Sequence, residues 1–392
     1  MTIRVLSVFG TRPEAIKMAP VVQALSQDSR FVASVCVTAQ HRQMLDQVLS
    51  IFDIKPDFDL DLMKPGQDLG ELTGRIVTAV QGVLRADRPD WILVQGDTTT
   101  CMAAALAAFY ERVAIGHVEA GLRSGRLDAP FPEEANRRIV SQIADLHFAP
   151  TDTASRNLVA EGFDKSRIIV TGNTVIDALL RARDRVQAMD PKTWRAAIGD
   201  ALASALEDGS RRVVLITGHR RENFGQGMKD LCTAIKSLAD GHPDWLFVYP
   251  VHLNPNVQQP VRSILDGVEN VHLIEPLDYL AFARMMDRSH LILTDSGGIQ
   301  EEASSLRKPV LVMRDVTERT EAVDAGLALL VGTNTERIVR SVEQLMLDPA
   351  AYRRMTSARN PYGDGTAARA ILDAIWQRQA EVGAAARRAP AR

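Results

Sequence analysis

The stretch HLILTDSGGIQEEAS, residues 290–304, places an apolar run directly before a glycine-rich turn and a helix-forming segment. The apolar run predicts a buried β-strand, and the residues after the two glycines favour a helix that opens with two glutamates. A strand that passes through a short turn into a helix is half of a βαβ unit. This stretch therefore predicts a parallel sheet covered by helices.

The same alternation of strand and helix runs along most of the chain. Helix-period segments include residues 14–25 and 335–346. Short apolar, β-branched runs lie between such segments, at residues 3–9, 32–38, 90–96, 113–119, 211–218, 245–251, 290–295 and 309–313. Strands that alternate with helices in this way are typical of doubly wound α/β folds with helices on both faces of each sheet.

The length of 392 residues favours two domains. The alternation pauses at residues 170–210, which are helical and polar, and resumes at Arg211. This segment could be one long insertion, but we interpret it as a linker between two doubly wound domains, because the predicted strands divide evenly around it. The domains are expected at residues 1–175 and 176–364, and the small, basic residues 383–392 are expected to form a flexible tail.

Composition excludes several classes of protein. The net charge of −3 provides no field that would attract nucleic acid. Cys36, Cys101 and Cys232 lack the spacing of a metal site or a disulfide framework, which favours a reducing compartment. The first residues are apolar over too short a length for a signal peptide, and no segment is long enough for a membrane span. A soluble cytoplasmic protein is expected.

Ligands of open parallel sheets bind beyond the carboxyl ends of the strands, so the residues that follow each strand deserve comparison. The first strand is followed by GTRPEAIK, in which Gly10 permits a tight turn and Pro13 suits the start of a helix. Arg12 in the turn and Lys17 one helical turn later could hold a phosphate; Lys17 alone would usually be a surface charge, whereas an arginine in the turn itself is less easily explained in that way. The fingerprints of dinucleotide and P-loop sites are missing, so no cofactor is expected.

Three acidic residues follow neighbouring strands of the first half. Asp97 lies in GDTTT, Glu119 in HVEAGLRSG, and Glu133 opens the segment EEANR. Threonines cap helices and acids favour helix starts, so the threonine run, Glu133 and Glu134 have a purely structural alternative. Three carboxylates at adjacent strand ends nevertheless indicate acid–base chemistry. No cysteine or histidine is spaced with them for a metal, and none is expected.

The second half contains two strand-end loops with histidines and the stretch that opens this section. His219 and Arg220 lie in a glycine-flanked loop suited to an anion or a proton transfer, and His252 follows another strand. Ser296, Gly297 and Gly298 would present helix amides to a phosphate. Glu302 would lie roughly 9 Å further along the helix axis, which matches the distance from a diphosphate to a ribose. A glycine-assisted helix contact with solvated glutamates is an equal alternative, and Glu301 has no assigned role.

Together these stretches resemble the bacterial non-hydrolysing UDP-N-acetylglucosamine 2-epimerases. The resemblance covers nearly the whole chain, and many ordered motifs make it specific. The matching motifs are VFGTRPEAIKMAP, TAQHRQMLDQVL, QGDTTT, GHVEAGLRSG, PFPEEANRR, TGNTVIDAL, TGHRREN, YPVHLNPNV, LTDSGGIQEEA, KPVLVMRDVTER and NPYGDG. One departure is Thr320, where the family has proline after its Thr-Glu-Arg motif; this could loosen the loop that carries Arg319.

The resemblance implies two Rossmann-like domains facing a cleft, as in GT-B glycosyltransferases, with a C-terminal helix at residues 365–380 packing back on the first domain. It also implies a homodimer. UDP would bind mainly to the second domain, through Ser296, Gly297, Gly298 and Glu302, with Arg12 and His219 at the diphosphate. The resemblance assigns catalysis to Asp97, Glu119, Glu133 and His219, and further active-site positions to Lys17 and Arg319. A second, activating substrate molecule would contact Gln40, His41, Gln43, Arg75, Glu134, Arg220 and His252.

The implied reaction converts UDP-N-acetylglucosamine to UDP-N-acetylmannosamine by elimination and re-addition of UDP through a glycal. The product would supply a precursor for surface polysaccharide. Two alternatives remain open at this point. A hydrolysing epimerase would release UDP and free sugar, and a glycosyltransferase on the same fold would require an acceptor.

Overall fold

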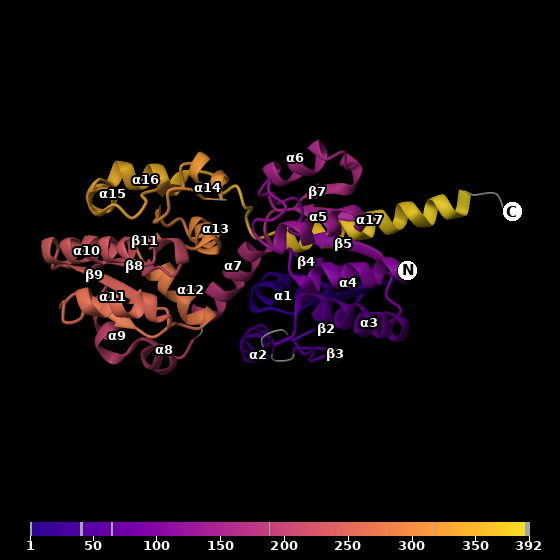
Figure 1. Ribbon diagram of the computed structural model, residues 1–392, viewed down its shortest axis with the longest axis horizontal. Coiled ribbons are helices and arrows are strands. Elements are labelled where there is room, and N and C mark those ends of the chain that lie inside the picture. The colour runs from indigo at the N-terminus through magenta and orange to yellow at the C-terminus, as the bar shows by residue number, and fades with distance from the viewer. Residues whose placement is uncertain (1, 40–41, 64–65, 188, 318, 389–392) are drawn as a thin grey trace. The chain divides into compact units, whose positions relative to one another are not determined.

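The computed structural model describes residues 2–39, 42–63, 66–187, 189–317 and 319–388. The chain forms two compact units (Figure 1). The first consists of Met1–Ala178 together with Tyr362–Arg392, and the second of Leu179–Pro361. The chain thus leaves the first unit, builds the second without interruption, and returns to complete the first.

The first unit is built on a parallel sheet whose described strands number seven, in the order β3-β2-β1-β4-β5-β6-β7. This is the strand order of dinucleotide-binding folds, with the point of reversal between β1 and β4. All of its strand pairs are parallel. The strands are β1 (Ile3–Phe9), β2 (Phe31–Val37), β3 (Phe58–Asp59), β4 (Trp91–Gln95), β5 (Ala114–Val118), β6 (Leu146–Ala149) and β7 (Ile168–Val170).

Helices pack on this sheet in two groups. In one group α4 packs against α3 and α5, and in the other α1 packs against α2 and α17. The helices are α1 (Arg12–Gln27), α2 (Arg42–Ile51), α3 (Leu69–Asp87), α4 (Thr99–Tyr110), α5 (Glu133–Ile143), α6 (Asp152–Ala160), the short η1 (Lys165–Arg167) and α17 (Ala367–Arg388). Most residues of the alanine-rich α4 are buried, which lets it lie close to β1, β4 and β5.

The second unit repeats this architecture. Its described strands form a parallel sheet of six in the order β10-β9-β8-β11-β12-β13, with the point of reversal between β8 and β11. They are β8 (Arg212–Thr217), β9 (Trp245–Pro250), β10 (Val271–Ile274), β11 (Leu291–Thr294), β12 (Val310–Val312) and β13 (Ala328–Leu330). The expected fold of two doubly wound α/β domains is confirmed.

Two described helices of the second unit precede its first strand, and the others follow its strands. They are α8 (Pro191–Ile198), α9 (Asp200–Glu207), the short η2 (Arg221–Asn223), α10 (Gln226–Gly241), α11 (Pro255–Leu265), α12 (Tyr279–Arg288), α13 (Gly297–Ser305), α14 (Thr320–Asp324), α15 (Thr335–Leu347) and α16 (Pro349–Ser357). A buried cluster that includes Trp245, Phe247 and Tyr249 joins β9 to α10 and α11. No helix of the described residues is both long enough and apolar enough to cross a membrane.

Two expectations about chain segments need correction. The interpretation of 170–210 as a linker is wrong, because α8 and α9 belong to the second unit and bury Trp194, Ile198, Leu202 and Leu206. Only α7 (Thr174–Gln187) carries the chain from one unit into the other. The predicted tail is also shorter than expected, because α17 continues to Arg388. Residues 389–392 lie outside the described part of the chain.

Candidate active site

The turn between β1 and α1 is held by a buried carboxylate that the sequence analysis did not single out. Glu14 completes a capping box with Thr11, and its side chain accepts hydrogen bonds from the Gly10 amide at 3.0 Å and the Thr11 amide at 2.7 Å. The same carboxylate accepts a hydrogen bond from Thr98 Oγ1 at 2.6 Å. Burial raises the pKa of Glu14, and these hydrogen bonds oppose the rise. The capping-box spacing of Thr11 and Glu14 was the available signal.

Glu14 therefore joins the two loops on either side of the reversal point of the first sheet. Arg12 is the first residue of α1, directly after Thr11. Asp97 directly precedes Thr98, whose side chain caps α4 by accepting from the Cys101 amide. The structural reading of the threonine run is thus confirmed for Thr98, while Asp97 is left with a different role.

Asp97 lies at the carboxyl end of β4 against an arginine of α5. Arg137 Nη2 donates to Asp97 Oδ2 at 2.5 Å, and Asn136 Nδ2 donates to the Asp97 carbonyl at 2.9 Å. Burial raises the pKa of Asp97; Arg137 opposes this rise, and the charge of Glu119 adds to it. A half-buried carboxylate with a raised pKa at a strand end is suited to proton transfer.

Glu119 is a buried carboxylate with partners on several elements of the first unit. Its backbone has φ 64°, which is unusual for a residue other than glycine, and its side chain is buried. Lys17 Nζ lies 2.5 Å from Glu119 Oε1, and Asn173 Nδ2 donates to the same oxygen at 3.1 Å. Gln95 Nε2 donates to Oε2. Lys17 and Glu119 are 102 residues apart in sequence, and the fold brings them into an ion pair.

Two adjacent glutamates open α5 and differ completely in their surroundings. Glu133 is half-buried, and its buried Oε2 has no hydrogen-bond partner among the described residues. Glu134 has a fully buried side chain that contacts Arg137 at 3.2 Å and Arg138 at 2.9 Å, and it accepts from the Ser124 amide at 3.0 Å. Glu133 thus has spare hydrogen-bonding capacity, whereas Glu134 fixes the loop before α5.

A second buried carboxylate, Asp295, organises the histidine loop of the second unit. Asp295 Oδ2 accepts from the His219 amide at 2.9 Å, the Arg220 amide at 2.8 Å and Asn223 Nδ2 at 3.2 Å. His219 Nδ1 lies 3.6 Å from Asp295 Oδ1. The sequence analysis counted Asp295 only as the end of a strand, because its partners lie more than seventy residues away.

His219 itself faces outward from this anchored loop. Its ring is stacked on that of His252, with 5.3 Å between the ring centroids. Burial lowers the pKa of His219; Asp295 opposes the decrease, and His252 and Arg220 add to it. His219, Arg220 and His252 are therefore neighbours, although they follow two different strands, β8 and β9.

The stretch at 294–304 forms the expected strand, turn and helix. Ser296 is the N-cap of α13, and its side chain makes no capping hydrogen bond to the first turn. Gly297 is buried and Gly298 is exposed, with no atom within 4 Å of where a Cβ of Gly298 would be. The first amides of α13 are thus available to an anion at the reversal point of the second sheet.

The two glutamates of α13 have different partners, which explains why both are present. Glu302 accepts a hydrogen bond from Tyr279 Oη at 3.2 Å. Glu301 accepts one from Arg319 Nε at 2.8 Å and is thereby ion-paired to the residue that precedes α14. Thr320, the departure from the family motif, is the first residue of α14.

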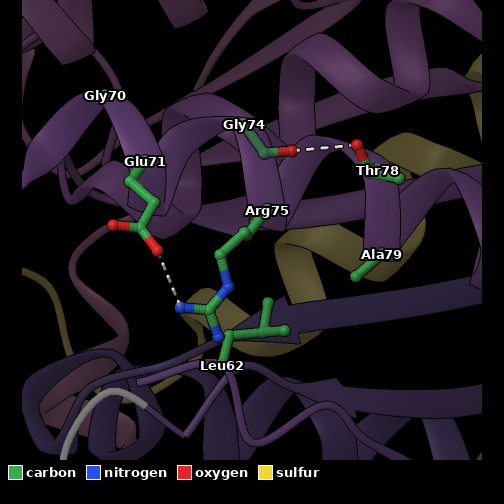
Figure 2. Close-up of a pocket in the computed structure, with 7 residues that line it drawn as sticks. All are labelled: Leu62, Gly70, Glu71, Gly74, Arg75, Thr78 and Ala79. Atoms are coloured by element: carbon green, nitrogen blue, oxygen red, sulfur yellow. Dashed lines mark hydrogen bonds and ion pairs between the residues drawn. The ribbon is translucent and has the colours of Figure 1, made fainter. Parts of the chain in front are cut away.

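Arg75 lines a surface depression of about 590 Å³ along α3 (Figure 2). Arg75 Nη1 donates to Gln67 Oε1 at 2.7 Å and lies 3.9 Å from Glu71 Oε1. Figure 2 shows Arg75 pointing toward Leu62 and Glu71. Gln40, His41 and the side chain of Gln43, which were assigned to the same second-substrate site, lie outside the described residues.

Known proteins resemble this chain over almost its entire length. The family model UDP-N-acetylglucosamine 2-epimerase matches residues 23–376. The UDP-N-acetylglucosamine 2-epimerase of Yersinia pestis is 57% identical over 376 residues, and its alignment covers 96% of this chain and 99% of that protein. The enzyme of the same name from Escherichia coli is 55% identical, with 95% of this chain and 98% of that protein covered.

A solved structure gives the same result. The UDP-GlcNAc 2-epimerase of Neisseria meningitidis, determined with UDP-GlcNAc bound, has a TM-score of 0.83 and 49% sequence identity. The alignment covers 96% of this chain and 100% of that chain. Family model, sequence relatives and solved structure agree, and the chain belongs to the UDP-N-acetylglucosamine 2-epimerase family.

Proposed function

We propose that this chain interconverts UDP-N-acetylglucosamine and UDP-N-acetylmannosamine by inverting C2 of the sugar, without net hydrolysis. The observation that carries the proposal is the pair of carboxylates at neighbouring strand ends with different charge partners. Asp97 faces Arg137, and Glu119 faces Lys17. The names of the relatives and the UDP-GlcNAc bound to the Neisseria structure support this substrate.

Elimination of UDP makes the proton on C2 removable. That proton is not next to a carbonyl group, so a carboxylate alone is too weak a base to take it. As the anomeric C–O bond breaks, positive charge develops on the ring and acidifies C2–H. A base removes the proton to leave a glycal, a proton returns to the opposite face of C2, and UDP adds back at C1.

The three acids of the first unit divide this work. Asp97 transfers a proton, because burial raises its pKa toward neutrality. Glu133 is the second proton-transfer group, because its buried Oε2 has no protein partner among the described residues. Glu119, which forms an ion pair with Lys17, stabilises the positive charge that develops on the ring.

The second unit provides most of the contacts to the leaving group. Ser296, Gly297 and Gly298 present helix amides to the phosphates, and Glu302 accepts the ribose hydroxyls. His219 and Arg12 contact the diphosphate and stabilise the charge that it gains as the C–O bond breaks. Arg319, oriented by Glu301, provides a further cation.

A second substrate molecule activates the enzyme in this proposal. Arg220 and His252 lie beside His219, so a ligand that contacts them would adjoin the leaving-group site. Arg75, which lines a surface depression along α3, is also assigned to the second-substrate site in this proposal. A homodimer and a product destined for surface polysaccharide complete the proposed function.

Incubation of the purified chain with UDP-N-acetylglucosamine in deuterated water tests the proposal. The expected result is UDP-N-acetylmannosamine at equilibrium with the substrate, with solvent deuterium at C2 of both sugars and UDP only in small amount. Stoichiometric UDP with free N-acetylmannosamine would identify a hydrolysing enzyme instead. Epimerisation that leaves C2 without deuterium would exclude the proton-transfer scheme.

A further inference from the structure

Asn173 contacts Glu119 and lies at the point where the chain leaves the first unit for the second. It directly precedes α7, the helix that begins in the first unit and ends in the second. Its side chain is buried and donates through Nδ2 to Glu119 Oε1 at 3.1 Å. Its Oδ1 accepts from the Val175 amide at 3.1 Å. One amide group therefore joins Glu119 to the first turn of α7.

The direction of both hydrogen bonds explains why the residue is an asparagine. The Val175 amide can only donate, so the oxygen of Asn173 must face it and the NH₂ group must face Glu119. An aspartate at this position would place a second carboxylate about 3 Å from Glu119 and would lose the donor. The geometry thus requires a side chain with a donor at one end and an acceptor at the other.

The returning segment of the chain is tied to the same point. The Asn173 amide donates to the Tyr362 carbonyl at 2.8 Å, and Tyr362 is the first residue of the first unit after the chain returns. The backbones approach so closely that a Cβ on Gly363 would lie 3.2 Å from Gly172 Cα. Both glycines have positive φ, 87° for Gly172 and 104° for Gly363, so neither position accepts a side chain easily.

Asp177 adds a third tie between the outgoing and returning chain. Its buried carboxylate accepts from the Ala367 amide at 3.2 Å and the Ala368 amide at 2.9 Å, at the start of α17. Asp177 lies one helical turn after Asn173 on α7. Asn173 therefore bonds to Glu119 and Tyr362, and Asp177 in the first turn of α7 bonds to α17.

We propose that Asn173 is a positioning residue that couples Glu119 to the two chain crossings between the units. A rotation of α7, or a shift of the returning segment at 361–368, would move the Nδ2 group and with it the Glu119 carboxylate. This inference rests on the proposed function in assigning Glu119 a part in the reaction. Of the three donors to Glu119 described above, Asn173 is the one that is bonded to a crossing, because Lys17 and Gln95 belong to α1 and β4.

Kinetics of Asn173→Ala provide the first part of the test. The expected result is a decrease in kcat of about 10- to 100-fold, the range for a lost hydrogen bond to a charged group, with the dissociation constant of UDP unchanged. The matched control is Asn157→Ala, which removes an amide that donates to the Gly121 carbonyl at 3.0 Å in the same loop but bonds to no crossing. A decrease in kcat no larger than that of the control would overturn the positioning role.

A variant at the crossing tests the coupling itself. Gly363→Ala touches no carboxylate, yet it should lower kcat because the added Cβ displaces Gly172 and, with it, Asn173. Combined with Asn173→Ala it should lower kcat no further than the worse single change, because both act through one contact. Fully additive effects, or a Gly363→Ala enzyme with normal kcat, would contradict the coupling. If Gly363→Ala does not fold, Asp177→Asn, which weakens the bonds to α17, takes its place.

Hydrogen–deuterium exchange of the full chain separates failure of this inference from failure of the proposed function. Asn173→Ala should speed exchange in the peptides that cover 117–121, 172–178 and 361–368, whereas Asn157→Ala should affect only its own surroundings. This readout needs no turnover. If the wild-type chain does not epimerise its substrate, the proposed function fails. If Asn173→Ala leaves exchange at 361–368 unchanged, the coupling of Asn173 to the returning segment is overturned, whether or not the chain is active.

Discussion

Arg319 Nε donates to Glu301 Oε1 at 2.8 Å, and the Glu301 side chain is only 3% exposed. The same helix holds the approach to Arg319 at a second point, because Thr317 Oγ1 donates to Gln300 Oε1 at 2.9 Å. The helix whose first amides face the proposed phosphate site thus also fixes a cation after the next strand. This relationship gives Glu301, which has no assigned role in the sequence analysis, a function distinct from that of Glu302.

Glu301→Gln and Glu302→Gln should therefore separate the orientation of Arg319 from the binding of the ribose. Glu301→Gln removes the charge that holds Arg319, and we expect a loss of about 1–3 kcal/mol in the free energy of unfolding together with a raised KM. Glu302→Gln keeps an acceptor for Tyr279, so the free energy of unfolding should change by less than about 0.5 kcal/mol while KM rises. Chemical denaturation and steady-state kinetics measure both. Equal effects of the two changes on stability would contradict this division.

Asp97→Asn should stop proton exchange at C2. The amide keeps the size of the side chain but cannot take a proton from carbon, so kcat should fall by about 10²- to 10⁴-fold. Binding of UDP should stay near the wild-type value, because Asp97 is assigned no contact with the diphosphate. Incorporation of solvent deuterium at C2 is the direct measurement. Asp87→Asn, which weakens the 3.0 Å ion pair with Arg4, is a control expected to leave exchange at C2 unchanged.

The pH dependence of substrate binding should report on His219. Burial lowers the pKa of its ring, so it is largely neutral in the free protein at neutral pH, and a bound diphosphate raises that pKa again. Binding then takes up protons, and the affinity for UDP-N-acetylglucosamine should increase as the pH falls from about 8 to about 6, by at most about tenfold per pH unit. The doubly esterified diphosphate of this ligand does not itself titrate in that range.

Calorimetry in buffers of different ionisation enthalpy measures the proton uptake of this reaction. His219→Gln should abolish it. His242→Gln removes an imidazole that stacks on Trp245 elsewhere in the second unit and should leave the uptake unchanged. An affinity that does not vary with pH in the wild-type protein would remove His219 from the diphosphate site.

Gly10→Ala should destabilise the first unit and lower its activity. A Cβ at this position would lie 2.0 Å from Thr38 Oγ1 and 2.7 Å from Thr100 Oγ1. We expect a loss of about 1–3 kcal/mol in the free energy of unfolding from overpacking. Gly82→Ala, in the middle of α3 with no atom within 4 Å of the new Cβ, should instead increase stability by about 0.5–1 kcal/mol. Thermal denaturation of both variants makes the comparison.

Gly10 was correctly predicted to be important for the turn after β1, but the physical reason for the glycine differs from the predicted one. The sequence suggested a tight turn, but Gly10 is not among the residues with positive φ. Glycine is needed because two threonine hydroxyls, hydrogen-bonded to each other at 3.0 Å, crowd the position. Thr38 and Thr100 come from other elements, so this crowding cannot be seen from local sequence.

The fold was predictable where apolar runs are long and bounded by turn residues. β1 matches its predicted range of 3–9 in full, and β4 and β8 lie within their predicted runs. Of the strands of two to four residues, β11 and β12 lie within predicted runs, but others, such as β3 and β13, were not identified, because so short a run has no period of its own. Their place is set by the neighbouring strand, which supplies the hydrogen bonds.

The candidate site divides in a similar way. Residues at strand ends, such as Asp97 and His219, could be selected from sequence, because the topology alone brings strand ends together. The groups that orient them could not. Asp295 binds a loop more than seventy residues earlier, and Glu14 reaches Thr98 across 84 positions. Such partners depend on three-dimensional distances that a single sequence does not contain.

The route of the chain has a consequence for synthesis on the ribosome. All residues of the second unit, Leu179–Pro361, are consecutive, whereas the first unit needs α17 to cover α1. Domains commonly fold in the order in which they are made. Here the unit that begins first is completed last. The second unit can form its whole core before the last helix of the first unit has been synthesised. A nascent chain halted before residue 362 would contain the whole sequence of the second unit, whereas its first unit would lack α17, the helix that covers α1.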